Sequence, residues 1–145
     1  MKPLSRDRSS VLHATCVALD GAGLLILGPS GSGKSGLALQ LMALGCHLIS
    51  DDQTRLFLRD DILWAAAVPT LAGRIEARFI GILAAPHLPG ARVALAVDLG
   101  RTETERLPVD RSIEHFGVSI PCLHRTDGAH FPAGLLLYLR AGRIA

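Results

Sequence analysis

The fold is decided by the stretch Gly28-Pro29-Ser30-Gly31-Ser32-Gly33-Lys34-Ser35, which matches G-x-x-x-x-G-K-[ST] at every fixed position. It follows the apolar run Leu24–Leu27, which indicates a strand. It opens the segment Lys34–Leu44, whose apolar residues predict a helix that ends at Gly45. In a strand–loop–helix unit of this kind, backbone N–H groups and the positive end of the helix surround an anion. The stretch therefore predicts a phosphate-binding loop, and a glycine-rich turn without a ligand is the alternative.

Each residue type in this loop has its own role in the chemistry. The glycines let the main chain approach phosphates because they carry no Cβ. Lys34 can reach the β- and γ-phosphates of a nucleotide, and the Ser35 hydroxyl can bind Mg²⁺. Of the 15 Lys and Arg residues only Lys2 and Lys34 are lysines, so a lysine at this position is notable. We expect all eight loop residues to bind ATP, with Mg²⁺ as the accompanying ion.

Adjacent carboxylates follow the next predicted strand, His47–Ser50. A right-handed crossover through the helix would return the chain to a strand parallel to the first, and Asp51-Asp52 would then end beside the phosphate loop. Such a pair could hold Mg²⁺ through water and accept a proton from an attacking hydroxyl. Asp98 is a competing candidate for the metal site, because it lies near the end of another predicted apolar strand, Val93–Leu99.

Composition places the motif in a single apolar domain. The chain has 145 residues, of which 49% are hydrophobic and 19% charged, so it can bury a core. The formal net charge of +2 is too small for a nucleic-acid footprint, and no apolar run approaches the roughly 18–20 residues that span a bilayer. We expect a soluble α/β protein with a flexible tail over residues 1–10 and one domain over residues 11–145.

The remaining elements are predicted from apolar patterns and turn residues. The predictions are a strand over Val11–Leu19, a hairpin of Thr54–Leu58 and Ile62–Ala67, a strand over Arg74–Leu83, an exposed loop over Gly100–Arg111, and a buried strand or helix over Ala133–Leu139.

Cysteine usage and the N-terminus bear on localisation. Cys16, Cys46 and Cys122 are odd in number and form no C-x-x-C pattern, so free thiols in a reducing compartment are expected. The basic start followed by apolar residues faintly resembles a signal peptide, but cleavage there would damage the phosphate loop. We expect the protein to be cytoplasmic.

The motifs together resemble the catalytic domain of bacterial HPr kinase/phosphorylase. They are His13, the phosphate loop, the segment His47–Asp52, and Ile75-Glu76-Ala77-Arg78-Phe79-Ile80-Gly81-Ile82. The resemblance implies a mixed sheet with few helices, like that of the HPr kinase and phosphoenolpyruvate carboxykinase nucleotide-binding folds. It also implies a protein serine kinase that acts on HPr, the phosphocarrier of the sugar phosphotransferase system. In the reverse direction, as a phosphorylase, inorganic phosphate would attack the phosphoserine and pyrophosphate would be released.

The resemblance also suggests a role for each matching residue. Asp51 would be the base that activates the serine hydroxyl, and Asp52 would support the metal or orient Asp51. Glu76 would bind Mg²⁺ together with Ser35, and Arg78 matches the arginine beside it. His13 would lie near the phosphates, with a core histidine as its alternative. Arg106 would engage phosphate in the dephosphorylating direction, with a solvated loop charge as its alternative.

The sequence departs from the family pattern at several places. Phe79 stands where the family usually has glycine, Ala129 replaces an arginine, and the stretch from Gly81 to Arg106 is shorter than usual. We expect a short form that resembles those of α-proteobacteria, with incomplete C-terminal helices, through which the family contacts HPr and neighbouring subunits, and without a separate N-terminal domain. A homo-oligomer, a hexamer in the family, is expected as well. A nucleotide-sensing module without catalysis and a small-molecule kinase or ATPase are the alternative functions.

Overall fold

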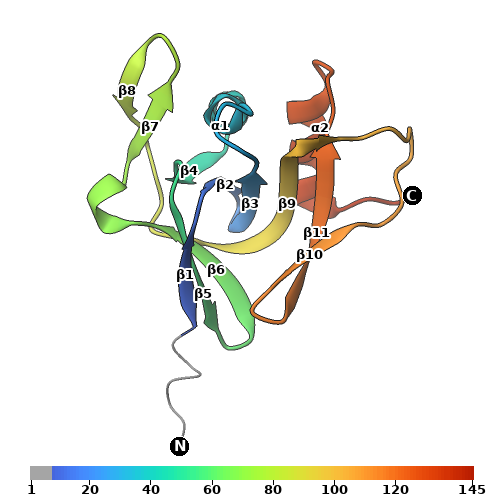
Figure 1. Cartoon of the computed structure of the whole chain (residues 1–145), viewed down its shortest axis with the longest axis horizontal. Coiled ribbons are helices and arrows are strands. Elements are labelled where there is room, and N and C mark those ends of the chain that lie inside the picture. The colour runs from blue at the N-terminus through green and yellow to red at the C-terminus, as the bar shows by residue number, and fades with distance from the viewer. Residues whose placement is uncertain (1–7) are drawn as a thin grey trace, which may run out of the picture.

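A long, bent β-sheet runs through the molecule, with α1 and α2 beside each other on one side (Figure 1). The structure is a computed structural model that describes residues 8–145. Its strands are β1 (Ser9–Leu12), β2 (Ala14–Leu19), β3 (Ala22–Leu27), β4 (His47–Ser50), β5 (Thr54–Arg59), β6 (Ile62–Ala67), β7 (Arg74–Ala77), β8 (Gly81–Ala84), β9 (Ala91–Thr102), β10 (Ser112–His115) and β11 (Val118–Arg125); its helices are α1 (Lys34–Ala43) and α2 (Phe131–Ala141), with a 3₁₀ turn at Pro69–Leu71.

The main sheet is mixed, as the sequence predicted. Its order is β1-β5-β6-β9-β3-β2-β4, and β11 joins it through β9 and carries β10. β9 runs parallel to both β3 and β11, whereas the other pairs in the sheet are antiparallel. β7 and β8 form a separate two-stranded sheet. The chain therefore combines a parallel centre, next to the phosphate loop, with antiparallel flanks.

The strand after the helix crossover has the direction of the first strand, as predicted, but another strand lies between the two. β4 has the direction of β3, but β2 lies between them and is antiparallel to both. The reason is the tight turn at Asp20 and Gly21, whose φ values are 50° and 82°. It folds β2 back beside β3, and left-handed residues of this kind suit a two-residue hairpin. The helix crossover must therefore pass over β2 before the chain enters β4.

Several predicted elements are divided or extended in the structure. The predicted strand Val11–Leu19 breaks at His13, because β1 pairs with β5 while β2 pairs with β3 and β4. The predicted strand Arg74–Leu83 is the β7–β8 hairpin, which turns where Phe79 has a φ of 68°. Ser9 and Ser10, placed in the predicted tail over residues 1–10, belong to β1, and residues 1–7 lie outside the described part.

The C-terminal third also differs from its prediction. The predicted strand Val93–Leu99 is part of the longer β9, which takes in the first residues of the predicted loop Gly100–Arg111. The segment Ala133–Leu139 lies in a helix, α2, of which Leu135 is the buried residue. β10 and β11 were not predicted. By contrast, α1, β4 and the β5–β6 hairpin agree with their predicted ranges to within a residue.

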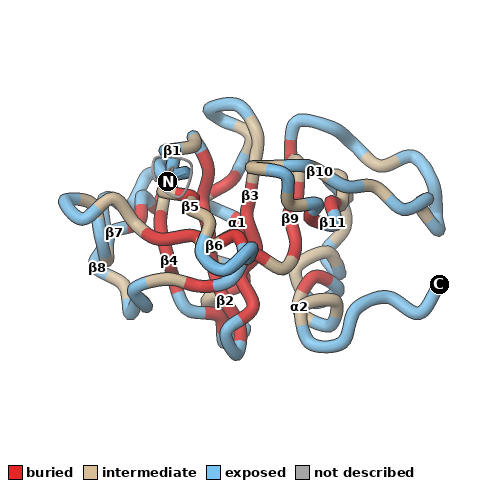
Figure 2. The backbone as a smooth tube through the Cα atoms, turned by 90° about the horizontal axis from the view of Figure 1, so that it is seen from below, coloured by how far each residue is buried: buried red, intermediate tan, exposed pale blue. Residues whose placement is uncertain are grey.

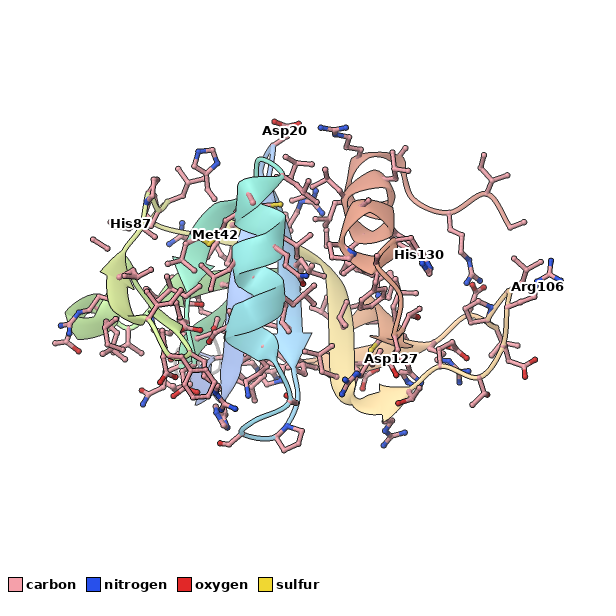
Figure 3. The ribbon with its side chains drawn as sticks, turned by 90° about the horizontal axis from the view of Figure 1, so that it is seen from above. Asp20, Met42, His87, Arg106, Asp127 and His130 are labelled. Carbon is pink, nitrogen blue, oxygen red and sulfur yellow. The ribbon has the colours of Figure 1, made fainter. Side chains whose placement is uncertain are left out.

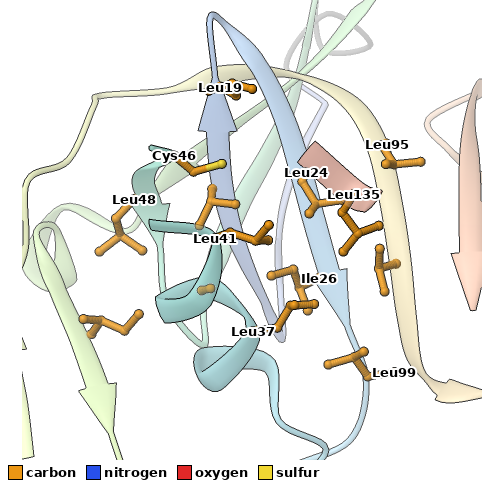
Figure 4. Packing of buried hydrophobic residues seen from close by; sticks show 14 residues of the cluster. Leu19, Leu24, Ile26, Leu37, Leu41, Cys46, Leu48, Leu95, Leu99 and Leu135 are labelled. Atoms are coloured by element: carbon orange, nitrogen blue, oxygen red, sulfur yellow. The ribbon is translucent and has the colours of Figure 1, made fainter. Parts of the chain in front are cut away.

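Apolar side chains fill both faces of the central strands. On the α1 face, Leu24 and Ile26 of β3 pack with Leu37 and Leu41 of the helix and Leu135 of α2 (Figure 4). The intervening residues of β3 point the other way, into a second cluster that is enclosed by the curled strands; its buried members include Leu25, Ile49, Leu56, Leu63 and Ile120. Burial is concentrated in β2, β3 and β9 (Figure 2). The phosphate loop therefore leaves a strand that is packed on both faces.

Neither α1 nor α2, the helices within residues 8–145, has the length and apolar character needed to cross a membrane.

An ion pair closes the 103–111 loop. The Arg111 guanidinium donates to both carboxylate oxygens of Glu103, from Nε at 3.2 Å and from Nη2 at 2.9 Å. The backbone N–H groups of Thr104 and Glu105 also donate to Glu103 Oε2. The Arg111 hydrogen bond in particular lowers the pKa of Glu103 to about 2. The ion pair thus joins the two ends of the loop, and backbone hydrogen bonds hold both ends to β11, from the Glu103 N–H to the Arg125 oxygen at 2.8 Å and from the Cys122 N–H to the Arg111 oxygen at 2.9 Å.

Truncation of Leu41, a core side chain of α1, should lower the stability of the protein. We expect Leu41→Ala to lower the free energy of unfolding by about 2–5 kcal/mol, because a fully buried leucine leaves a cavity. Leu44→Ala is the matched control, since Leu44 is 46% exposed and should cost less than about 1 kcal/mol. Urea denaturation followed by circular dichroism measures both, and equal losses would contradict the packing described above.

The Glu103–Arg111 pair predicts a pH-dependent stability. The folded pKa lies below the ordinary value of 4.5, so the stabilisation is present above about pH 5 and is lost as the pH falls toward 2. We therefore expect the difference in Tm between the wild type and Glu103→Gln to shrink over that range. A difference in Tm that stays constant between pH 7 and pH 2.5 would show that the charge of Glu103 is not the source of the stabilisation.

Candidate active site

The phosphate loop connects β3 to α1 through backbone conformations that glycine allows. Gly28, Gly31 and Gly33 have φ values of 147°, 84° and 98°. A Cβ added at Gly28 would lie 2.5 Å from Ser32 Oγ, so this turn also excludes a side chain on steric grounds. Gly33 is the N-cap of α1 and provides no side-chain hydrogen bond to the first turn. The first amides of the helix are therefore available to an anion.

Lys34 lies at the base of this loop. Its side chain is nearly buried, at 6% exposure. Its ammonium donates to the carbonyl oxygens of Gly28 at 2.9 Å and Pro29 at 3.2 Å. An ammonium has three donors, so one remains for a ligand in the pocket that Lys34 lines.

Asp51 is held by donors from three other elements. Its Oδ1 accepts hydrogen bonds from Ser35 Oγ of α1 at 2.6 Å and from Thr15 Oγ1 of β2 at 3.0 Å. Its Oδ2 accepts the backbone N–H of Glu76 in β7 at 2.9 Å. The carboxylate is half-buried, and both of its oxygens are engaged. This geometry fixes the Ser35 hydroxyl and the base of the β7–β8 hairpin relative to each other.

Asp52 is much more open than its neighbour. It adopts a left-handed conformation with a φ of 65°, and its backbone N–H donates to Thr15 Oγ1 at 3.2 Å. His13 Nε2 lies 2.7 Å from Asp52 Oδ1, and the two side chains are 47% and 65% exposed. Within residues 8–145, Asp52 Oδ2 accepts no hydrogen bond, so it is available to an incoming group.

These residues surround a pocket of about 740 Å³. The phosphate loop and α1 form one wall, the end of β4 forms the floor, and the β7–β8 hairpin with the preceding 3₁₀ turn forms the opposite wall. The lining residues are Ser30, Gly31, Gly33, Lys34, Ser35, Gly36, Leu39, Asp51, Asp52, Gln53, Leu71, Arg74, Ile75, Glu76, Arg78 and Ile82. The pocket combines cations, carboxylates and a glycine-rich loop, which are the groups that phosphoryl transfer needs.

Most of the residues predicted for the site therefore meet around one pocket. Lys34, Ser35, Asp51, Asp52 and Glu76 all line it, and Gly28, Pro29 and Ser32 shape the loop beneath it. His13 does not line it but contacts Asp52. Sequence reasoning did not single out Thr15, Gln53, Leu71 or Arg74; the hydroxyl of Thr15 in an otherwise apolar strand was the available signal for that residue.

Two candidates do not line this pocket. Asp98 ends the part of β9 that pairs with β3, but its Oδ1 accepts the Gly100 N–H at 2.8 Å and its Oδ2 lies 3.5 Å from Arg101 Nε. Arg106 is exposed on the 103–111 loop, at the outer edge of the molecule and far from α1 (Figure 3). The loop stays there because Glu103 binds Arg111 and the neighbouring Asp110 binds Arg143 at 2.8 Å.

The donors in the pocket suit a hard divalent cation. The Ser35 hydroxyl and the Glu76 carboxylate offer oxygen ligands, which Mg²⁺ prefers. In the described part of the chain, no group of three or more His, Cys, Asp and Glu side chains is arranged to hold a metal by itself. This fits Mg²⁺, which usually keeps waters and phosphate oxygens in its coordination shell.

Comparison with known proteins identifies close counterparts. The family model described as HPr Serine kinase C-terminal domain matches residues 5–122. The HPr kinase/phosphorylases of Streptococcus pneumoniae strains Hungary19A-6 and ATCC BAA-255 / R6 are each 36% identical over 129 residues, which cover 79% of this chain and 41% of theirs. The chain thus spans about 41% of the length of the curated relatives it matches.

A solved structure supports the fold independently. The Hpr(Ser) kinase/phosphatase from Coxiella burnetii superposes with a TM-score of 0.76 and 23% identity, covering 90% of this chain and 88% of that chain. The mixed sheet with few helices, predicted from the resemblance, is therefore confirmed.

Loss of the Lys34 ammonium should weaken nucleotide binding. We expect Lys34→Met to raise the Kd for ATP roughly 10- to 100-fold, because a charge-assisted hydrogen bond contributes about 1.5–3 kcal/mol. Isothermal titration calorimetry measures the affinity, and Arg140→Met, on the exposed side of α2, controls for the lost charge. An unchanged Kd in Lys34→Met with a normal Tm would remove Lys34 from the binding site.

Proposed function

The chain belongs to the HPr serine kinase C-terminal domain family, and from this premise we propose that it is an ATP- and Mg²⁺-dependent protein serine kinase acting on the phosphocarrier HPr. The observation that carries the proposal is the meeting of Lys34, Ser35, Asp51, Asp52 and Glu76 around one pocket. The names of its relatives, HPr kinase/phosphorylase, supply the reaction and the protein substrate.

The phosphate loop would bind the triphosphate of ATP. The amides at the start of α1 and the remaining Lys34 donor would contact its oxygens. Ser35 and Glu76 would hold Mg²⁺, with Asp51 keeping the Ser35 hydroxyl in position through its 2.6 Å hydrogen bond. When bound, the ion supplies charge neutralisation for the transferring phosphate.

Asp52 is better suited than Asp51 to be the catalytic base. The resemblance assigned this role to Asp51, whose two oxygens are occupied by Ser35, Thr15 and the Glu76 amide. A base must accept a new proton, and Asp52 has an oxygen that meets no donor among residues 8–145, together with 65% side-chain exposure. We therefore assign proton acceptance to Asp52 and positioning of the metal ligands to Asp51.

His13 would act through Asp52. The 2.7 Å contact between His13 Nε2 and Asp52 Oδ1 orients the carboxylate and leaves Oδ2 directed elsewhere. As a protein serine enters, its hydroxyl oxygen would bond to the γ-phosphorus while the bond to ADP breaks. The hydroxyl proton would pass to Asp52. His13 is thus a positioning residue in this scheme.

The proposal is restricted to the kinase direction. The reverse reaction with inorganic phosphate was linked to Arg106, and this residue lies on a loop fastened away from the pocket by the Glu103–Arg111 pair. The names of the relatives, HPr kinase/phosphorylase and Hpr(Ser) kinase/phosphatase, include the reverse direction, but the arginine that the resemblance linked to it does not line the pocket of this chain.

We also propose that the enzyme works in the cytoplasm. Cys16, Cys46 and Cys122 are free and buried, and burial raises the pKa of the Cys16 thiol to about 12. Unpaired thiols of this kind are typical of a reducing compartment.

Transfer of label from γ-labelled ATP to purified HPr tests the function. We expect the wild type to label HPr on serine and Asp52→Asn to lower kcat by about 100- to 10,000-fold, the usual contribution of a general base, with ATP affinity retained. Asp20→Asn is a matched control, because Asp20 is also an exposed aspartate with positive φ, in the turn before β3.

Other results would redirect the proposal. Steady loss of ATP without an acceptor would indicate a small-molecule kinase or an ATPase, and ATP binding without turnover would indicate a nucleotide-sensing module. Full activity in Asp52→Asn with a large loss in Asp51→Asn would return the base to Asp51.

A further inference from the structure

The β7–β8 hairpin is anchored at its base and free at its tip. Ile75 is 1% exposed and belongs to the core beneath α1, and the Glu76 N–H donates to Asp51. Beyond this base, β7 and β8 pair only with each other in the described chain, and the hairpin stands clear of the main sheet (Figure 1). All four residues of β8 are exposed. The hairpin therefore projects a surface that the fold itself does not use.

That surface is apolar. Phe79 is 100% exposed, Ile80 75%, Ile82 64% and Leu83 38%. Isolated exposed apolar residues are ordinary, but these are four large ones within five positions of one projecting hairpin, a clustering that marks interaction sites. Ile82 and Leu83 are successive residues of β8 and point to opposite faces, so the apolar surface surrounds the tip of the hairpin. We call these four residues the hairpin patch.

Phe79 has a strained backbone conformation that no packing of its side chain within this chain compensates. Its φ of 68° lies in the left-handed region, where glycine is unstrained and an aromatic residue is not. Its fully exposed ring gains nothing from burial. Phenylalanine at this position therefore costs stability without improving packing. A contact with another molecule would account for it.

The hairpin patch is continuous with the pocket. Ile82 belongs to both, and Arg78, which lines the pocket, directly precedes Phe79. A small acceptor would fill the pocket without reaching Phe79 and Ile80 at the tip. A protein whose serine enters the pocket would extend over the hairpin wall. The patch thus fits an apolar surface next to the acceptor serine of a folded protein.

Resting on the proposed kinase function, we infer that the hairpin patch, with Phe79 at its tip, docks the protein substrate by contacting an apolar surface beside its acceptor serine. The docking is separate from nucleotide binding, since the phosphate loop lies on the opposite wall of the pocket. Loss of Phe79 should therefore affect recognition of the protein and leave the chemical step intact.

Kinetics of HPr phosphorylation by Phe79→Gly test this inference. We expect the KM for HPr to rise about tenfold or more, the effect of losing a central aromatic anchor, with kcat within about twofold and the Kd for ATP unchanged. The Tm should not fall, because glycine relieves the left-handed strain. Leu137→Ala, a 66% exposed leucine on α2, is the control and should change none of these values.

A benzophenone amino acid at position 79 gives a readout that does not depend on catalysis. Irradiation with HPr and a non-hydrolysable ATP analogue should cross-link the two proteins, and the same amino acid at position 137 should not. Light scattering on Phe79→Gly distinguishes a contact between copies of this chain. A lower mass with an unchanged KM would assign the hairpin to self-association and overturn the inference.

The outcomes separate the two proposals. If the wild type labels HPr and Phe79→Gly has the same KM, the kinase function stands and the docking surface is wrong. If the wild type does not label HPr but cross-links to it through position 79, the docking stands and the reaction is wrong. Neither labelling nor cross-linking would overturn both.

Discussion

The carboxylate of Asp51 is the constraint on which the geometry of the pocket depends. Asp51 directly follows β4 and receives hydrogen bonds from Ser35 in α1, Thr15 in β2 and the Glu76 amide in β7. Hydrogen bonds to a charged group are stronger than neutral ones, about 1.5–3 kcal/mol each. A single side chain thus fixes the phosphate loop, the sheet and the hairpin wall relative to one another, which is the observation behind the proposal that the exposed carboxylate of Asp52, and not Asp51, accepts the proton.

Local signals in the sequence were sufficient for the elements that form the phosphate site. The glycine pattern and Lys34 identify the loop, the apolar residues of Lys34–Leu44 identify α1, and Asp60 and Asp61 identify the turn of the β5–β6 hairpin. These features depend on neighbours within a few positions, so pattern and backbone preference determine them. The meeting of Asp51 with Ser35 was also predictable, because a helix crossover brings the end of β4 back to the loop.

Long-range features could not be obtained in this way. The position of β2 between β3 and β4 depends on which edge the chain returns to, and alternation within a strand does not encode it. The same is true of the different environments of Asp51 and Asp52, which are adjacent in sequence: Asp51 meets three donors from distant elements, whereas Asp52 has a left-handed φ and contacts His13. Arg106 was placed near the phosphates by resemblance, whereas two ion pairs far along the chain, Glu103–Arg111 and Asp110–Arg143, hold its loop elsewhere.

The parallel pairing of β3 with β9 has a consequence for how the protein is made. Residues 28–90 separate the end of β3 from the start of β9. Translation adds about 5–20 residues per second, so β3 leaves the ribosome seconds before the strand that completes one side of it. During that interval the nascent chain carries the whole phosphate loop on a strand with one open edge. The phosphate loop is therefore synthesised early, but the strand beside it on the β9 side is added only later in synthesis.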